Sequence, residues 1–498
     1  MIDPNVLATL PNNTVMSGSM SAASLPQLEE LRKALTAGQT YNIQDQSGGQ
    51  ALRLQSLDAT MQSMIQTNDH FRLLNRLAKP SAGGTVDEWT EQSGVGGFLG
   101  GSTNTETGDI PEASGVYTRR VGVVKFLMTR RQVSFVLTLN AAIAEAEAIE
   151  QANGALQLLT DAEYLLFEGD SSVVPTEWDG IAKQMTDFGR AANILDMRGT
   201  PLTSQQPIVH AATTIASYGN FGKPTDLFLS PMAQADLDNS LDPAFRVPLP
   251  SVPNGGVSLG APVVGIRTSW GSIATQPDVF IRDENLQVPM SVTDPVRVAQ
   301  TANAALKGNA SVAITATQSG AVAGSKWAAA HVGWYAYKVA AVGSVGESAL
   351  IDGDTAAQIT QPGDKLTVTI TNGTAAATGW AIYRSYKCAS EAEAEAVTAD
   401  NMRLVKRIPS TATTTTFNDL NADIPGCSKG YVLNLSPEAH SLTWRQLLPM
   451  SRFNLYPTVS AVIPWAQLLF GYLRISKRPH VVMIKNILPN GVAWRPFG

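Results

Sequence analysis

Cysteine and histidine are scarce in this chain of 498 residues. The two cysteines, Cys388 and Cys427, form no C-x-x-C motif, and nothing indicates an oxidising compartment in which they would pair. The histidines lack the spacing of metal ligands, so we expect no metal site and no cofactor. The five are His70, His210, His331, His440 and His480.

Charged residues are also few, at 16% of the chain, and the formal net charge is −6. Proteins that read nucleic acids carry a basic patch or stripe, and the overall balance gives no such footprint. Glycine, alanine, serine and threonine are abundant instead. That composition is typical of β-rich, closely packed or assembled surfaces rather than of a highly charged monomer.

Long apolar runs are nearly absent. The N-terminus has no basic region followed by an apolar core, so no signal peptide is predicted. Between Arg452 and Arg474 no residue is charged, which is long enough to span a bilayer. Pro457 and Pro464 interrupt this stretch, so buried strands are the better interpretation and no membrane contact is expected.

Motifs of catalysis are incomplete. Residues 256–260 match the G-x-S-x-G nucleophile elbow but lack the preceding strand and following helix. The sequence Phe221-Gly222-Lys223 ends like a phosphate-binding loop, yet Pro224 stands where a serine or threonine is required. No catalytic constellation remains, so we expect no enzymatic activity.

The longest regular feature is a helix predicted over Leu139–Asp170. Its apolar residues recur every three or four positions, which forms one stripe along a helix. Asn140 is the expected N-cap, and Gly169 is expected to end the helix. If continuous, the helix is roughly 40 Å long. Its acidic N-terminal residues are expected on an exterior face, toward neighbouring subunits or an interior: Glu145, Glu147 and Glu150.

Before this helix lie an arm and a long ribbon. The arm is polar, with short helices predicted at Leu25–Leu35 and Leu52–Leu77. A strand, a glycine-rich tip and one long return strand then follow over residues 84–135. An isolated two-stranded ribbon is marginally stable in water, so this one needs a surface to lie on.

The ribbon separates its charges by sign, and we expect these residues to pair between subunits. The acidic residues expected to take part are Glu91, Glu106, Asp109 and Glu112. The basic residues of the return strand are Arg119, Arg120, Lys125, Arg130 and Arg131. An ordinary surface hairpin with solvated charges is the alternative interpretation.

After the long helix the chain reads as mixed helix and strand. A strand followed by a helix is predicted in residues 226–241, and further strands at Val263–Arg267 and Val279–Arg282. Residues 470–487 indicate two strands paired with each other.

Residues 295–429 differ in composition and contain short strands separated by turn signals, which predicts a β-sandwich. The segments Tyr335–Val342 and Trp380–Ser385 resemble strands of fibronectin type III or immunoglobulin-like modules, in reversed order. Because the sequence after residue 429 again has the character of the main domain before residue 295, the sandwich is interpreted as an insertion.

The end of the long helix carries a family resemblance. Phe167-Glu168-Gly169-Asp170 is followed by Pro175 and by Gly180-Ile181. A long helix with this ending resembles the tailed-phage major capsid proteins of the Hong Kong 97 type. The order of elements in residues 1–294 and 430–498 is similar to theirs, and some members carry immunoglobulin-like insertions. The expected motif residues are Phe167, Gly169, Asp170, Pro175 and Gly180.

The resemblance implies an α+β fold of that capsid type, with an all-β sandwich inserted. The expected parts are an N-terminal arm (1–80), an extended loop (81–135), a spine helix with a peripheral domain (136–224), the first part of an axial domain (225–294), the insertion (295–429) and a return through both domains (430–498).

It also implies a function. The chain would assemble with itself into hexamers and pentamers of an icosahedral phage head in the host cytoplasm, with the insertion on the outside. Implied partners are a scaffolding protein, a portal, decoration proteins and packaged double-stranded DNA, bound without sequence specificity. The alternatives are an encapsulin-like compartment and, from the sandwich alone, a phage surface adhesin or tail protein.

Overall fold

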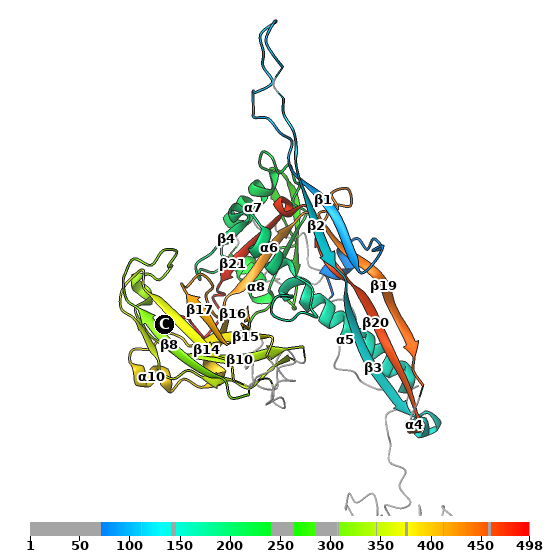
Figure 1. The fold of residues 1–498 in the computed structure, drawn as a ribbon, viewed down its shortest axis with the longest axis vertical. Coiled ribbons are helices and arrows are strands. Elements are labelled where there is room, and N and C mark those ends of the chain that lie inside the picture. Colours follow the sequence, from blue (N-terminus) through cyan, green and yellow to red (C-terminus); the bar gives the residue numbers. More distant parts are fainter. Residues whose placement is uncertain are drawn as a thin grey trace, which may run out of the picture. The chain divides into compact units, whose positions relative to one another are not determined.

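The fold of this chain was analysed in a computed structural model (Figure 1). It describes residues 71–110, 112–140, 146–240, 263–284, 306, 308–344, 346–373, 377–411, 413–456 and 460–497. The helix predicted at 25–35, most of the one at 52–77 and the segment 256–260 lie outside these residues. Helices and many strands are mixed along the described chain, as the sequence predicts.

The main part of the chain contains a six-stranded mixed sheet. Its central strands are apolar on both faces, because alternate residues enter different cores. Leu227 and Leu229 pack with helix α7, whereas Phe228 between them packs with helix α5. In sheet order the strands are β4 (Ile194–Asp196), β21 (Val481–Ile487), β18 (Ser428–Leu433), β5 (Asp226–Leu229), β7 (Gly271–Pro277) and β6 (Gly265–Thr268). The helices are α5 (Ala146–Glu168), α6 (Ile181–Phe188), α7 (Gln206–Ala216) and α8 (Pro231–Ser240).

A separate three-stranded antiparallel sheet runs beside helix α5 (Figure 1). Gln467 of its middle strand donates a hydrogen bond to the carbonyl of Gln151 in α5. A short helix, α4, follows the outer strand. The strands in order are β19 (Leu442–Asn454), β20 (Val462–Ile475) and β3 (Lys125–Ser134); α4 is Phe135–Asn140 and α3 is Leu73–Arg76.

The long helix differs from its prediction at the N-terminal end. Helices α4 and α5 occupy its place, residues 141–145 lie outside the described residues, and Asn140 is the last residue of α4 rather than an N-cap. Only the C-terminal half of the apolar stripe is buried, at Leu158, Ala162 and Leu166. Leu139, at the other end, is 71% exposed.

The predicted single return strand is two strands that pair with different sheets. Strand β2 (Val116–Val123) pairs with β1 (Val86–Gly94), while β3 pairs with β20. Between them Val124 is buried and donates its backbone N–H to the carbonyl of Thr85. The ribbon therefore begins as a β1–β2 hairpin whose root is fixed at the edge of a larger sheet.

The insertion is a β-sandwich with its own core. Val312, Ile314, Leu366 and Val368 of one sheet pack against Trp380 of the other and its neighbours. The first sheet is β17 (Thr414–Asp419), β14 (Lys365–Thr371) and β8 (Ser311–Thr317). The second contains β11 (Gly346–Glu347), β12 (Ile351–Asp352), β10 (Tyr337–Gly343), β15 (Gly379–Arg384) and β16 (Arg403–Pro409). Smaller elements are β9 (Gly333–Tyr335), β13 (Ala357–Ile359), α10 (Glu391–Glu395), and 3-10 helices at Ala191–Asn193, Ala329–His331, Ala399–Asn401 and Arg478–His480.

The second sheet of the sandwich is covered on both faces. Its residues Ala340 and Ala381 belong to a further core that includes Val173 and Val174, which follow helix α5. The chain end also contacts the sandwich: the Phe497 ring lies 3.8 Å from that of His331, and the Trp494 indole donates to a backbone carbonyl. The insertion is therefore packed into the rest of the chain.

Two strand predictions in the main part are wrong. Residues 279–282 form turns, and the strand lies just before them, at β7. Residues 470–487 contain parts of β20 and β21, which belong to different sheets and do not pair with each other. By contrast, the strand and helix predicted in 226–241 correspond to β5 and α8.

Two buried carboxyl groups meet where the described chain begins. Glu163 of α5 is fully buried and accepts the backbone N–H groups of Leu73 and Leu74, at 2.6 and 2.9 Å. Asp278 lies beside it, and its Oδ2 has no donor among the described residues. Burial, together with the charge of Glu163, raises the pKa of Asp278 to about 8. The two carboxyl groups thus favour sharing a proton.

We expect Asp278→Asn to flatten the dependence of stability on pH. In the wild type the raised pKa of Asp278 means that stability is highest below its ordinary pKa near 4 and falls as the pH rises towards 8. The asparagine amide can replace the shared proton as a donor to Glu163. Thermal unfolding from pH 5 to pH 9 measures the effect. An equally steep decline in the variant would contradict the shared proton.

Candidate functional site at the root of the ribbon

The segment after helix α5 is built on a close approach of two glycines. Gly180 donates its N–H to the carbonyl of Gly169, at 2.9 Å. A Cβ atom on Gly169 would lie 2.4 Å from the Trp178 carbonyl oxygen, and one on Gly180 would lie 2.7 Å from that of Leu165. Neither glycine has a positive φ. The helix ends at Glu168, just before Gly169 as predicted, and the lack of room for a Cβ atom accounts for glycine at this position.

The other motif residues hold this junction together. Phe167 is fully buried against the rings of Phe228 and Tyr431. The Asp170 carboxylate accepts the N–H of Ser172, and its carbonyl accepts that of Val174. Pro175 offers its carbonyl to the ammonium group of Lys125 on strand β3. All five motif residues thus lie in one junction between α5, α6 and the ribbon.

The inward face of strand β1 carries Asp87, Trp89 and Glu91, and each contacts an arginine. Asp87 accepts two hydrogen bonds from Arg445, at 2.9 and 3.2 Å. The guanidinium of Arg474 lies over the Trp89 ring, 4.5 Å from its centroid. Glu91 forms ion pairs with Arg120 and Arg478, at 3.1 and 3.4 Å. These contacts attach the root of the ribbon to strands β19 and β20 and to the segment that follows β20.

Asp87 is the most heavily bonded of the three. Burial would raise the pKa of its carboxyl group, but hydrogen bonds from Tyr472 and Arg445 and the charges of Arg445 and Arg474 outweigh it, so the pKa is lowered. The Tyr472 hydroxyl donates at 2.6 Å. Asp87 is therefore held as a carboxylate, which keeps its arginine pairs charged.

The outward face of the ribbon carries uncovered apolar side chains beside polar ones. Val86 is paired with Val123, and Glu88 with Val121. Val121 is 56% exposed and Tyr117 is 64% exposed. Among the described residues, one ion pair lies on this face and joins Arg119 to Glu88. We call Val86, Tyr117, Val121 and Val123 the outer face of the ribbon.

The ribbon tip is exposed as well. Phe98, Leu99 and Ile110 are largely exposed, Ile110 by 90%. The acidic Glu106, Asp109 and Glu112 are exposed beside them. Within the described part of the chain, no ion pair involves these three carboxylates.

The nine residues predicted at a subunit interface separate into two groups. Glu91, Arg120, Lys125 and Arg131 have partners within the chain, Arg131 with Glu150 at 3.3 Å. Arg130, Glu106, Asp109 and Glu112 remain exposed, as does Arg119, although it forms an ion pair with Glu88.

The acidic face predicted on the long helix is also engaged within the chain. Glu147 pairs with Arg452 of β19 at 2.5 Å, and Glu150 with Arg131 of β3. Both carboxylates are about one-third exposed, so the prediction that they face neighbours or an interior stays a prediction, while Glu145 lies outside the described residues.

Sequence reasoning missed the arginines that attach the ribbon, Arg445, Arg474 and Arg478. They lie more than 350 residues from Asp87 and Glu91 in sequence. The available signal was the alternation of Asp87, Trp89 and Glu91, which places all three on one face of the strand. That face predicts an attachment but does not name its partner.

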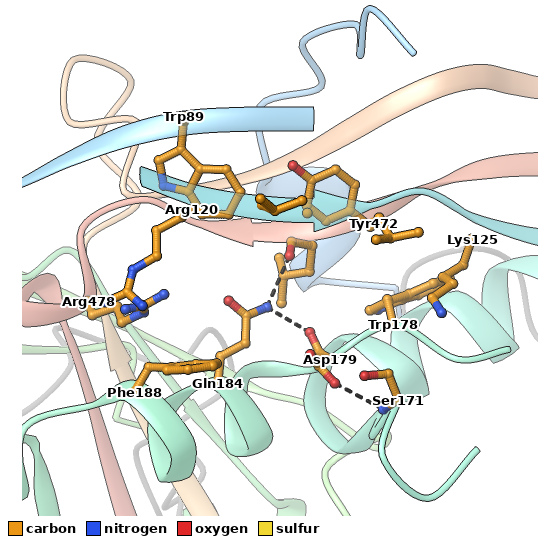
Figure 2. A pocket seen from close by; sticks show the side chains of 14 residues that line it. Trp89, Arg120, Lys125, Ser171, Trp178, Asp179, Gln184, Phe188, Tyr472 and Arg478 are labelled. Atoms are coloured by element: carbon orange, nitrogen blue, oxygen red, sulfur yellow. Dashed lines mark hydrogen bonds between the residues drawn. The ribbon is translucent and has the colours of Figure 1, made fainter. Parts of the chain in front are cut away.

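A cavity of about 200 Å³ lies beneath the ribbon root (Figure 2). Trp89 and Arg120 come down from the ribbon, and Gln184 and Phe188 rise from helix α6. Arg478 closes one end, next to Phe188. In the described part of the chain we find no group of three residues able to hold a metal ion, and no described helix is long and apolar enough to span a membrane.

Comparison with known proteins gives only distant similarity. No family model and no curated protein sequence matches the chain. Among solved structures it is similar to the capsid of a native GTA particle, at 8% identity and a TM-score of 0.46, covering 90% of this chain and 100% of the other. A structure from Mycobacterium phage Bobi shares 9% identity, with a TM-score of 0.40 and coverage of 87% and 96%. The holo-SrpI encapsulin complex from Synechococcus elongatus shares 8% identity, with a TM-score of 0.38 and coverage of 87% of this chain and 94% of the other. Such values assign no function.

We expect Gly169→Ala to destabilise the protein by about 1–3 kcal/mol, because the new methyl group would overlap two backbone carbonyls that cannot easily move. Gly83→Ala is the matched control, since a Cβ there meets nothing within 4 Å. Chemical denaturation of both variants measures the difference. Equal stability of the two would mean that the glycine contact is not a packing requirement.

Proposed function

We propose that this protein is a structural subunit that assembles with itself into a closed shell, a major capsid protein of the Hong Kong 97 type. The observation that carries the proposal is the ribbon. Its inward face is fixed by arginines at the root, whereas its outer face and tip leave large apolar side chains uncovered. Contiguous exposed apolar residues on a strand surface are typical of protein–protein contacts.

The thermodynamics of the ribbon support this proposal. A two-stranded hairpin cannot bury both faces, and its stability in water is marginal. An interface with a second subunit would remove Val121, Tyr117 and their neighbours from water, at about 25 cal/mol for each Å² of apolar surface. The exposed ion pair of Arg119 and Glu88 would add about 0–1 kcal/mol and contribute mainly to register.

The remaining parts would follow the order of that family. The arm and ribbon (1–135) would contact neighbours, α5 would be the spine, and β4 to β7 with β18 and β21 would supply the peripheral and axial domains. We propose immunoglobulin-like character for the sandwich, facing outward. Packaged double-stranded DNA would touch the inner surface without sequence-specific contacts. A scaffolding protein, a portal and decoration proteins would be the other partners, and the assembled virion the location.

Replacing Val121 and Val123 with glutamate should abolish assembly while the monomer stays folded. Both side chains are at least half exposed, so the charges cost little within one chain but would be desolvated at an interface. Electron microscopy and sedimentation of the purified protein measure assembly, and circular dichroism reports folding. Val332→Glu, an exposed valine on the sandwich, is the control.

If the double variant still forms shells or capsomers as the wild type does, the ribbon is not an interface between subunits. A wild-type protein that stays monomeric at high concentration would contradict the shell proposal itself. Shells that copurify with enzymes rather than with DNA would favour an encapsulin-like compartment.

Deleting residues 306–424 should lower the thermal midpoint strongly. The deletion uncovers Val173 and Val174, and each fully buried valine is worth about 1.5–3 kcal/mol. It also removes the contacts of Trp494. Calorimetry of the shortened chain measures the loss, with Thr367→Ala on the sandwich surface as the control. An unchanged midpoint would mean that the insertion is only an appended decoration.

A further inference from the structure

The cavity beneath the ribbon root is lined by cations stacked on an aromatic ring. The guanidinium carbons of Arg478 and Arg120 lie 4.8 and 5.5 Å from the centroid of Phe188. Both arginines extend toward the same end of the cavity, one from above and one from the side (Figure 2). Gln184 lies next to them and uses its amide N–H groups on the carbonyls of Asp179 and Leu473.

These cations are incompletely neutralised. Glu91 is the carboxylate that pairs with both Arg120 and Arg478. Lys125 lines the opposite part of the cavity and is bonded to a neutral carbonyl, that of Pro175. Asp179 also lines the cavity, but its carboxylate accepts the backbone N–H of Ser171. Three cations therefore face two carboxylates, one of which is turned to a backbone donor.

Several donors at the cavity lack acceptors. The Arg478 Nε and the indole nitrogens of Trp89 and Trp178 are buried and have no hydrogen-bond partner among the described residues. Arg478 and Trp178 are each more than 90% buried. Unsatisfied buried donors cost free energy, and an anion with several acceptor oxygens would relieve that cost.

The surroundings of Arg478 disfavour its positive charge. Burial lowers the pKa of its guanidinium, Glu91 restores part of it, and the nearby charge of Arg120 lowers it further. A second negative group beside Arg478 would favour its charged form. The charged groups beside it are Glu91 and Arg120, while Asp179 and Lys125 line the cavity farther away.

We propose that this cavity is an anion-binding site that takes one carboxylate or phosphate-type group. Its volume of about 200 Å³ is more than ten times the roughly 10–15 Å³ that one water molecule needs on the same measure, so such a group fits. The group could be a free anion, or a carboxylate from a second copy of the chain. The ribbon tip would offer the latter, because residues 93–115 contain three acidic and no basic side chains.

The test is calorimetric titration of the full chain with inorganic phosphate, with acetate and with a synthetic peptide of residues 102–114, at constant ionic strength. Arg120→Gln removes a cation whose side chain is one-third exposed, so the fold should survive. Arg267→Gln, an exposed arginine on β6 away from the cavity, is the matched control. We expect saturable binding to the wild type and to the control, and roughly tenfold weaker binding to Arg120→Gln.

Each outcome is informative. Saturation by phosphate or acetate supports a free anion, and saturation by the peptide alone assigns the site to a second copy. If Arg120→Gln fails to fold, Arg120→Lys, which keeps the charge but loses the planar fork, should bind more weakly than the wild type. Absence of saturable binding by all three ligands, or equal binding by the cavity variant and the control, would overturn the proposal. Neither result depends on shell formation, which microscopy tests separately.

Discussion

The attachment of strand β1 to the arginines of the C-terminal strands is the constraint on which the ribbon depends. A hairpin of this length cannot hold its direction by its own hydrogen bonds. Asp87 and Glu91 fix it because each meets two arginines in partly buried surroundings, where charge-assisted bonds are stronger than on an open surface. Trp89 lies between them and contributes apolar area and the contact with Arg474. The inward face of strand β1 therefore fixes the direction in which the outer face of the ribbon points.

The same attachment explains why the chain changes sheets at Val124. Strand β2 ends where β1 begins, and the next residues continue the β19–β20 sheet as β3. Val124 is buried and donates its N–H to Thr85, which ties this connection to the residue before β1. Lys125 then contacts the junction after α5. The consecutive residues Val124 and Lys125 thus connect the ribbon, the three-stranded sheet and the end of helix α5, which are distant from one another in sequence.

The sequence predicted those elements whose periodicity is local. The C-terminal half of the long helix, strand β5 with helix α8, and the sandwich strands all follow from spacing and turn signals. Sequence reasoning failed where the structure of a segment depends on which distant strand or side chain it contacts. Nothing local distinguishes one long strand from β2 and β3, or tells that β20 and β21 belong to different sheets. The charges of the ribbon were noticed, but pairing with Arg478 or Glu150 depends on tertiary contacts. The shell itself remains a prediction.

The apolar run in strand β15 of the sandwich indicates burial on both faces of its sheet, in addition to a strand. Residues Gly379–Arg384 are buried without alternation, which a sheet with one wet face would not tolerate. Trp380 and Ile382 fill the sandwich core, whereas Ala381 and Tyr383 pack toward Val173. A module displayed on a flexible stalk would alternate apolar and polar residues along this strand. Its continuous burial means that the insertion and the helix junction stabilise each other, so any surface role of the sandwich must be carried by its other sheet, where β8 alternates between buried and exposed residues.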